Sequence, residues 1–377
     1  MRIPSRLAVV AAGMFLATAL TAQTLTVPPN GDNEPATVSQ GIGPVKVTID
    51  YHSPKVIRGT NDRRGKIWGT LVPYGLQPGL GYGTCTQCPW RGGANENTTF
   101  TVSHDVKIEG QPLKAGTYGL HFIPDPNEWT IVFSKNAASW GSFYYDPAED
   151  ALRVKAKPAK SEFHDFLTYE FTEREPAKAT VALKWEELQL PWTITVDNVN
   201  ELWLASITEQ LRGSAAFDTQ NFMGAAQFAL QNKVGLPQAL KWAQTAVNGQ
   251  FIGQANFNTL STLADAQEAN GLTAESAKTR DQALNDPSAT VFDLHQYARQ
   301  LQIAGKNDEA AKVFELNAKR HPNVWPVNVG MARASAIHGK KAEALKYAKL
   351  AQTQAPDETS KKNLETLMKQ IEDGTMK

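Results

Sequence analysis

Residues 192–211, WTITVDNVNELWLASITEQL, contain a change in apolar period that separates two kinds of structure. In the first part apolar and polar residues alternate, which is typical of a strand with one buried face. Its apolar members are Trp192, Ile194 and Val196. After Asn198, a residue type that often caps helices, the spacing becomes helical. The apolar members of this second part are Leu202, Trp203, Ile207 and Leu211. The sequence therefore predicts a β-rich domain followed by a helical region.

Upstream of this change, period-two alternation dominates residues 45–197. The alternating segments are 45–51, 100–102, 118–122, 129–133, 152–156, 167–171, 181–185 and 192–196. Turn sequences such as Pro124-Asp125-Pro126-Asn127 separate them, and no segment of helix length intervenes, which excludes parallel βαβ units. We expect an antiparallel β-sandwich over residues 45–197, with a barrel as the alternative.

Downstream, residues 198–213 are expected to form a linking helix and residues 214–373 a series of repeats. Glycines recur with spacings of 36, 34 and 34 residues, at Gly235, Gly271, Gly305 and Gly339. Each glycine precedes an Ala-rich segment, and prolines follow the last three of these segments at Pro287, Pro322 and Pro356. Small residues let paired helices approach closely, and proline ends the second helix of a pair.

This 34-residue helical period resembles the tetratricopeptide repeat. About three and a half degenerate repeats fit the spacing of the glycines and prolines. Stacked repeats of this kind present a concave surface, so the resemblance implies a protein or peptide partner. The alternative is a helical appendage that only stabilises the first domain.

The first 22 residues have the pattern of a signal peptide. Arg2 and Arg6 form a charged start, residues 7–20 are an apolar run, and Ala22 is a small residue suited to cleavage. The apolar run is too short for a comfortable membrane span. We expect a periplasmic or secreted protein with no membrane span after cleavage, an uncleaved anchor being the alternative. Residues 23–44, rich in Pro, Gly, Asn and Thr, are expected to be a flexible leader.

The two cysteines, Cys85 and Cys88, form a CxxC motif near the end of a Gly- and Pro-rich stretch, residues 71–90. We expect this stretch to be a structureless loop. In an oxidising compartment the motif predicts a local disulfide that staples the loop, with a redox-active pair as the alternative. Zinc would need two further ligands and no second cysteine pair exists, so we expect neither a metal nor a cofactor.

The charge balance argues against nucleic-acid binding. The 377-residue chain has 38 Lys and Arg residues against 38 Asp and Glu residues, a formal net charge of zero. Nucleic acids are bound largely through a basic surface, which this composition does not predict.

Several motifs occur in a characteristic order through the β region. They include DYHSP at 50–54, IWG at 67–69, LVPYG at 71–75, WRGGANENT at 90–98 and LKAGTY at 113–118. Together they resemble the bacterial family catalogued as domain of unknown function 2911. In the family pattern the Pro-Tyr-Gly element runs almost directly into Trp-Arg, whereas this chain inserts residues 76–89 with the cysteine pair. The resemblance implies a β-rich exported domain and assigns no chemistry.

One turn between two apolar runs combines the residue types of a binding site, namely Trp90, Arg91, Asn95 and Glu96. A guanidinium fork beside an amide and a carboxylate suits recognition of a sugar, a peptide terminus or a carboxylate. The structural alternative is that Arg91 pairs with Glu96 or Asp50 and only holds the turn. Within the same turn, the pair of glycines at 92–93 is expected where the backbone needs a positive φ.

The histidines give no complete catalytic or metal constellation. His52 and His121 lie opposite the apolar residues of their own strands, so we expect both at the surface. His104 could orient for general-base work, but no nucleophile occurs in a recognisable elbow. The sequence therefore favours a non-enzymatic binding or scaffold protein, in which the β domain presents a small-ligand or cell-wall site. The alternative is a hydrolase of sugars or peptides with Glu96 or His104 as acid/base.

Overall fold

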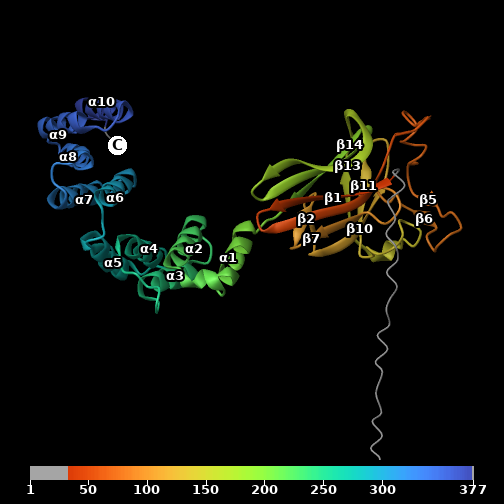
Figure 1. The fold of residues 1–377 in the computed structure, drawn as a ribbon, viewed down its shortest axis with the longest axis horizontal. Coiled ribbons are helices and arrows are strands. Elements are labelled where there is room, and N and C mark those ends of the chain that lie inside the picture. The colour runs from red at the N-terminus through yellow and green to blue at the C-terminus, as the bar shows by residue number, and fades with distance from the viewer. Residues whose placement is uncertain (1–32, 376–377) are drawn as a thin grey trace, which may run out of the picture. The chain divides into compact units, whose positions relative to one another are not determined.

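The computed structural model describes residues 33–375, which form two units that divide between Val196 and Asp197. The division lies at the change of apolar period near Asn198. The first unit is made of strands and the second of helices (Figure 1). The expected signal peptide, residues 1–22, and residues 23–32 of the expected leader lie outside the described residues.

The first unit contains two antiparallel sheets, as the alternation predicted. The six-stranded sheet has the order β1 (Asn33–Ile42), β2 (Val45–Pro54), β7 (Thr99–Val102), β10 (Gly116–Ile123), β11 (Trp129–Ser134) and β12 (Asp150–Ala156). The four-stranded sheet has the order β13 (Ala159–Glu175), β14 (Lys178–Thr195), β8 (Val106–Ile108) and β9 (Gln111–Leu113). Neither sheet closes on itself, so the unit is a sandwich rather than a barrel.

Aromatic contacts join the two sheets. Tyr51 of β2 lies 4.8 Å from Tyr169 of β13 between ring centroids, and Phe122 of β10 lies 6.0 Å from Trp192 of β14. Burying each such ring contributes roughly 1.5–3 kcal/mol relative to leaving it exposed. The core of the sandwich is therefore built from the inward faces of both sheets, as period-two strands require.

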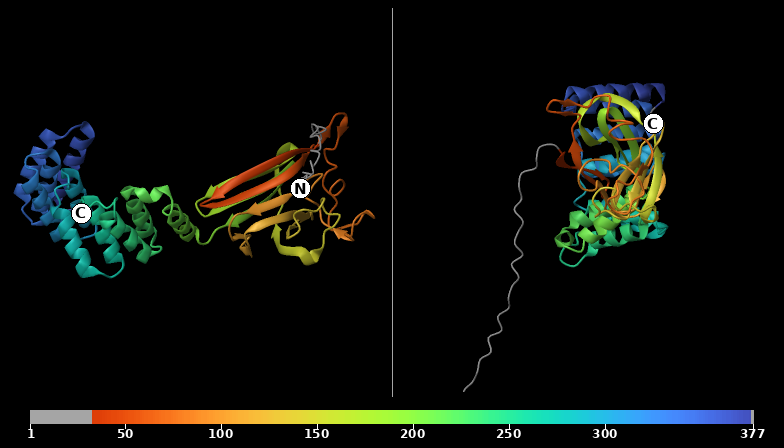
Figure 2. Two further views of the ribbon diagram at one scale, coloured as in Figure 1. Left: turned by 60° about the horizontal axis from the view of Figure 1, so that its bottom comes forward. Right: turned by 90° about the vertical axis from the view of Figure 1, so that its right-hand side faces the viewer.

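Strand β1 corrects the expected leader. It begins at Asn33, inside the stretch 23–44, and pairs with β2 along its whole length, from Asn33 opposite Pro54 to Ile42 opposite Val45 (Figure 2). The composition does not indicate a strand here, because β1 is an edge strand in which five of the ten residues are exposed and position 35 is a proline.

Two further expectations about the β unit need correction. Segments 181–185 and 192–196 belong largely to one long strand, β14, in which Glu186 adopts a left-handed φ of 56°. Before Glu186 the larger buried apolar side chains stand at odd-numbered positions, and after it they stand at even-numbered positions, as happens at a β-bulge. The stretch 71–90 is not structureless, because β5 (Gln77–Pro78) pairs with β6 (Gln87–Cys88), and Cys85 is bonded to Cys88. The disulfide prediction is confirmed.

The second unit consists of helical hairpins. After α1 (Val199–Gln210), the pairs are α2 (Thr219–Asn232) with α3 (Leu236–Asn248), α4 (Phe257–Ala269) with α5 (Thr273–Asn285), α6 (Val291–Ile303) with α7 (Asn307–Arg320), and α8 (Trp325–Ile337) with α9 (Lys341–Gln354). Helix α10 (Glu358–Asp373) follows. The tetratricopeptide-like arrangement is confirmed, with four pairs in residues 33–375 rather than three and a half.

The repeat signals act as expected. Gly271, Gly305 and Gly339 adopt φ values of 77°, 77° and 72° between the two helices of a pair, a backbone conformation that favours glycine. Buried alanines from successive helices form a continuous core with Trp242 and Phe314. Asn198 precedes α1, but its side chain makes no capping hydrogen bond. None of the described helices combines the length and apolar character that crossing a bilayer requires.

Candidate functional site

Trp90 anchors the turn that was expected to hold a site. Its backbone N–H and C=O each exchange a 2.7 Å hydrogen bond with Phe122 of β10. Its ring stacks on Trp185 with 6.3 Å between centroids and meets the edge of Trp68 at 5.8 Å. The half-buried Trp90 therefore fixes the start of the turn against the core.

Gly92 is required by the close packing beneath this turn. Its φ is 66°, and a Cβ atom there would lie 2.5 Å from the Phe122 ring and 2.6 Å from the Tyr169 hydroxyl. The Tyr169 hydroxyl also donates a 2.7 Å hydrogen bond to the Gly92 carbonyl. The expectation of a positive φ is thus confirmed for Gly92, whereas Gly93 adopts no positive φ.

Trp90 and Arg91 line a pocket on the β unit. It is also lined by Gln77, Cys88, Ser142 and Phe143. The disulfide loop and the loop around Phe143 both line the pocket. They are joined to each other because the N–H groups of Thr84 and Cys85 both donate to the Phe143 carbonyl at 3.0 Å. The inserted residues 76–89 therefore form one wall of this pocket.

The Arg91 guanidinium is half-buried and has no carboxylate partner in residues 33–375. It donates to the Asn95 carbonyl and lies over the Phe143 ring, 5.1 Å from the centroid. Burial lowers the pKa of Arg91 from its usual value, although an arginine remains charged at neutral pH. Gly141 leaves the space that the guanidinium occupies. The charged Arg91 guanidinium is therefore held in place by one hydrogen bond to the Asn95 carbonyl, and within residues 33–375 most of its N–H donors have no partner.

His121 and Ser142 lie close to Arg91. His121 Nδ1 is 3.1 Å from Ser142 Oγ, and His121 is 1% exposed. The expectation that His121 lies at the surface is wrong, because the loop carrying Ser142 and Tyr145 covers the second face of β10. Burial, and secondarily the charge of Arg91, lowers the pKa of His121 to about 4. A serine nucleophile needs a base whose protonated form is stabilised. Burial and the charge of Arg91 destabilise protonated His121, so His121 is poorly suited to act as the base for Ser142.

Asn95 and Glu96 are not among the residues that line the pocket. Asn95 adopts a φ of 57°, and its side chain accepts a 3.3 Å hydrogen bond from Asn33. Glu96 lies 3.1 Å from Nε2 of His52. The structural alternative is therefore wrong about the partner, because Arg91 pairs with neither Glu96 nor Asp50. It is right that Arg91 holds the turn, through the hydrogen bond to the Asn95 carbonyl.

His104 is bonded locally and lies outside the pocket lining. Its Nδ1 is 2.9 Å from Ser103 Oγ, at the connection between β7 and β8. It is not among the residues that line the pocket beside Arg91. No group of three or more metal-ligating side chains is found within the described part of the chain.

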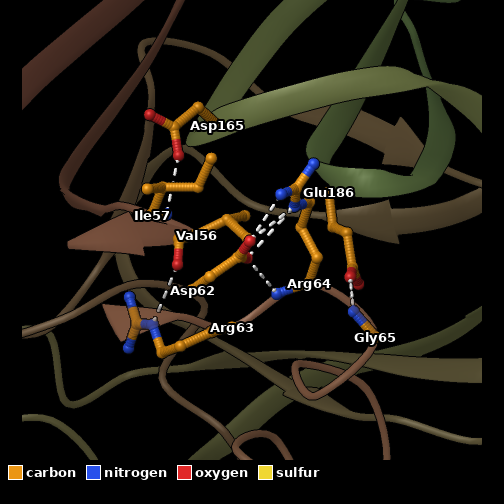
Figure 3. Close-up of polar contacts among 8 residues, drawn as sticks. All are labelled: Val56, Ile57, Asp62, Arg63, Arg64, Gly65, Asp165 and Glu186. Carbon is orange, nitrogen blue, oxygen red and sulfur yellow. Dashed lines mark hydrogen bonds and ion pairs between the residues drawn. The ribbon is translucent and has the colours of Figure 1, made fainter. Parts of the chain in front are cut away.

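Two carboxylates elsewhere in the β unit, Glu186 and Asp165, accept hydrogen bonds from backbone N–H groups. Figure 3 shows Glu186 accepting from the Gly65 N–H and Asp165 accepting from the Ile57 N–H at 2.8 Å. The other residues labelled there are Val56, Asp62, Arg63 and Arg64, among which Arg64 pairs with Asp62 and Arg63 donates to the Val56 carbonyl. These contacts attach the segment after β2 to the second sheet.

The fold and pocket define a two-part protein in which an antiparallel sandwich with a small pocket precedes tetratricopeptide-like hairpins. Residues 33–194 match the family model described as protein of unknown function, DUF2911. No curated protein matches the chain.

Among solved structures, the chain is similar to YrrB, which is titled a TPR protein with an unusual peptide-binding site. The identity is 17% and the TM-score 0.29, and the match covers 45% of this chain and 84% of YrrB. The chain is similar to a putative kinesin light chain from Podospora anserina at 18% identity, covering 41% and 85% with a TM-score of 0.30. A tetratricopeptide repeat protein from Parabacteroides merdae matches at 13% identity, covering 45% and 66% with a TM-score of 0.30.

Proposed function

We propose that the protein is an exported, non-enzymatic binding scaffold. The pocket of the β unit holds a small acidic ligand, and the helical hairpins hold a peptide segment of a partner. The observation that carries the proposal is the Arg91 guanidinium, which is half-buried beside Trp90 and Phe143 without a carboxylate partner in the described residues.

The chemistry of the pocket defines the ligand class. A carboxylate can accept two parallel hydrogen bonds from one guanidinium, which is the strongest pairing available to Arg91. Trp90, Phe143 and neighbouring prolines supply an apolar lining, and Gln77 supplies an amide. We therefore propose a ligand with one carboxylate and a sugar-like or apolar face, for which a cell-wall fragment is a source in an exported compartment. The Cys85–Cys88 disulfide supports export, because disulfides persist in oxidising compartments.

The hydrolase alternative finds less support. Neither Glu96 nor His104 lines the pocket beside Arg91, and the field at His121 opposes general-base work by that imidazole. No arrangement of these residues favours catalysis over binding.

Binding of glucuronate and glucose to the full chain tests the proposal by calorimetric titration. We expect glucuronate to bind and uncharged glucose not to bind, because only the acid offers the carboxylate. Arg91→Gln should abolish glucuronate binding, and Arg174→Gln, which alters an exposed arginine outside the pocket, should leave it unchanged. Glucuronate binding that survives Arg91→Gln, or equal binding of both sugars, would overturn the assignment.

A further inference from the structure

Two arginines of the helical unit lie one repeat apart. Arg299 is on α6 and Arg333 on α8, and their separation, 333 − 299 = 34, equals that of Gly305 and Gly339, 339 − 305 = 34. Residues separated by one period occupy equivalent positions in successive repeats. The two guanidinium groups are therefore brought together on the first helices of adjacent hairpins.

Their contacts confirm this juxtaposition and show how few acceptors they share. Arg299 donates to Oε1 of Gln302 at 2.5 Å, and Arg333 reaches the same oxygen at 3.4 Å. Nε of Arg333 and Nδ1 of His295 are buried and have no hydrogen-bond partner in residues 33–375. One neutral amide oxygen thus serves two guanidinium groups that carry five donors each.

The nearby acids are engaged elsewhere. Asp265 occupies the equivalent position one repeat earlier, 299 − 265 = 34, but it pairs with Arg280 at 2.8 Å. Asp293 of α6 closes the capping box with Thr290.

On α7, Glu315 lies 3.3 Å from His338. No carboxylate of the described residues forms an ion pair with either Arg299 or Arg333. Burial, and secondarily the charge of Arg299, lowers the pKa of Arg333 to about 10. The repulsion between the two cations is therefore uncompensated within this part of the chain.

Apolar side chains flank the pair on the same helix. Phe292 and Ile303 of α6 are 61% and 75% exposed, and both lie on the helix face of Arg299 because they are seven residues before and four residues after it. A free inorganic ion would leave these side chains in water. A polypeptide can cover them while it supplies an anion.

We propose that Arg299 and Arg333 together bind a carboxylate of an acidic peptide segment, with Phe292 and Ile303 contacting apolar residues beside it. This inference rests on the proposed peptide binding by the helical hairpins and specifies the chemistry of the partner. The two guanidinium groups then share a full negative charge instead of a single amide oxygen. His295 adds a neutral ring beside them.

The test begins with random dodecapeptides selected by mRNA display on the full chain. Recovered peptides are resynthesised, and their affinities are measured by fluorescence anisotropy. We expect enrichment of Asp and Glu over the input library and a loss of at least about tenfold in affinity, roughly 1.4 kcal/mol, when the peptide's Glu residues are replaced by Gln. Arg299→Gln with Arg333→Gln should reproduce this loss, whereas Arg212→Gln, an exposed arginine paired with Glu209, should not.

The outcomes separate this inference from the proposed function. Recovered peptides without acidic enrichment that bind the double variant normally would overturn the inference and leave peptide binding standing. Recovery of no peptide at all would overturn both. Competition by phosphate but not by glutarate would overturn the carboxylate assignment. If the double variant fails to fold, the Glu-to-Gln peptides and the glutarate competition decide the matter with the unaltered chain.

Discussion

At the scale of single residues, the feature shared by Arg91 and Arg333 is a guanidinium that has lost water without gaining a carboxylate. Removing a charge from water costs several kcal/mol unless a partner of opposite charge is supplied. A hydrogen bond to a charged group contributes about 1.5–3 kcal/mol, so a bound carboxylate can recover much of this cost. The binding role assigned to both arginines follows from this imbalance.

The position of Gly92 gives a prediction about stability. Gly92→Ala should lower the free energy of unfolding by more than about 2 kcal/mol, because the methyl group would strain the positive φ and collide with Phe122 and Tyr169. Urea denaturation measures the change. Gly110→Ala is a suitable control, since that glycine has a φ of 76° but open space around its Cβ position. Equal losses for both variants would refute the packing explanation.

His121 predicts a pH dependence of folding. Its pKa in the folded protein is about 4, below the ordinary value of 6.5, so between these values the unfolded chain binds a proton that the folded chain does not. Stability should therefore fall as the pH decreases from 6.5 to 4, by about 2–4 kcal/mol from this residue. Urea denaturation across this range measures the slope, and His121→Asn should reduce it. An unchanged slope in that variant would show that other groups cause the acid sensitivity.

The sequence predicted part of the candidate site. Trp90 and Arg91 line the pocket, because the motif places them together on one turn. Asn95 and Glu96 do not line it, because their side chains contact Asn33 and His52, which lie outside the pocket lining. Ser142 and Phe143 were missed because loops far apart in sequence form the opposite wall, and no local pattern records that contact.

At the scale of elements, two irregular segments shape the β unit. The bulge at Glu186 lets one long strand keep its apolar residues inward on both sides, which a strict period of two could not reveal. The inserted loop gains order from the β5–β6 pair and from the Cys85–Cys88 bond. Cys85 packs against Val132 and Tyr145, so this bond is attached to the sandwich.

Removal of the disulfide gives a prediction for this loop. Cys85→Ala with Cys88→Ala should cost about 2 kcal/mol of stability, since a short closed loop limits the unfolded chain only slightly. Glucuronate affinity should fall with it, because Cys88 lines the pocket. Calorimetric titration and urea denaturation measure the two effects. A loss of binding without any loss of stability would instead assign the sulfur atoms a direct role in binding.

At the scale of the whole molecule, the change of period near Asn198 and the 34-residue spacing predicted both units and their order. Arg299 and Arg333 are separated by the same 34 residues as the repeat glycines, so the spacing also places them at equivalent positions of adjacent repeats. Their lack of counter-charge could not be read from the sequence. It depends on Asp265, Asp293 and Glu315 being paired with other residues, which tertiary packing decides.

Scanning calorimetry of the full chain with and without glucuronate and glutarate tests the central claim, that arginines lacking a counter-charge make each unit a receptor for carboxylates. We predict that these acids raise the unfolding temperature and that glucose does not, because a ligand that binds only the folded state stabilises it. Arg91→Gln should remove the stabilisation of the β unit, and Arg299→Gln with Arg333→Gln that of the helical unit. Unfolding temperatures that do not change when the acids are added, or that rise equally in every variant, would contradict the account.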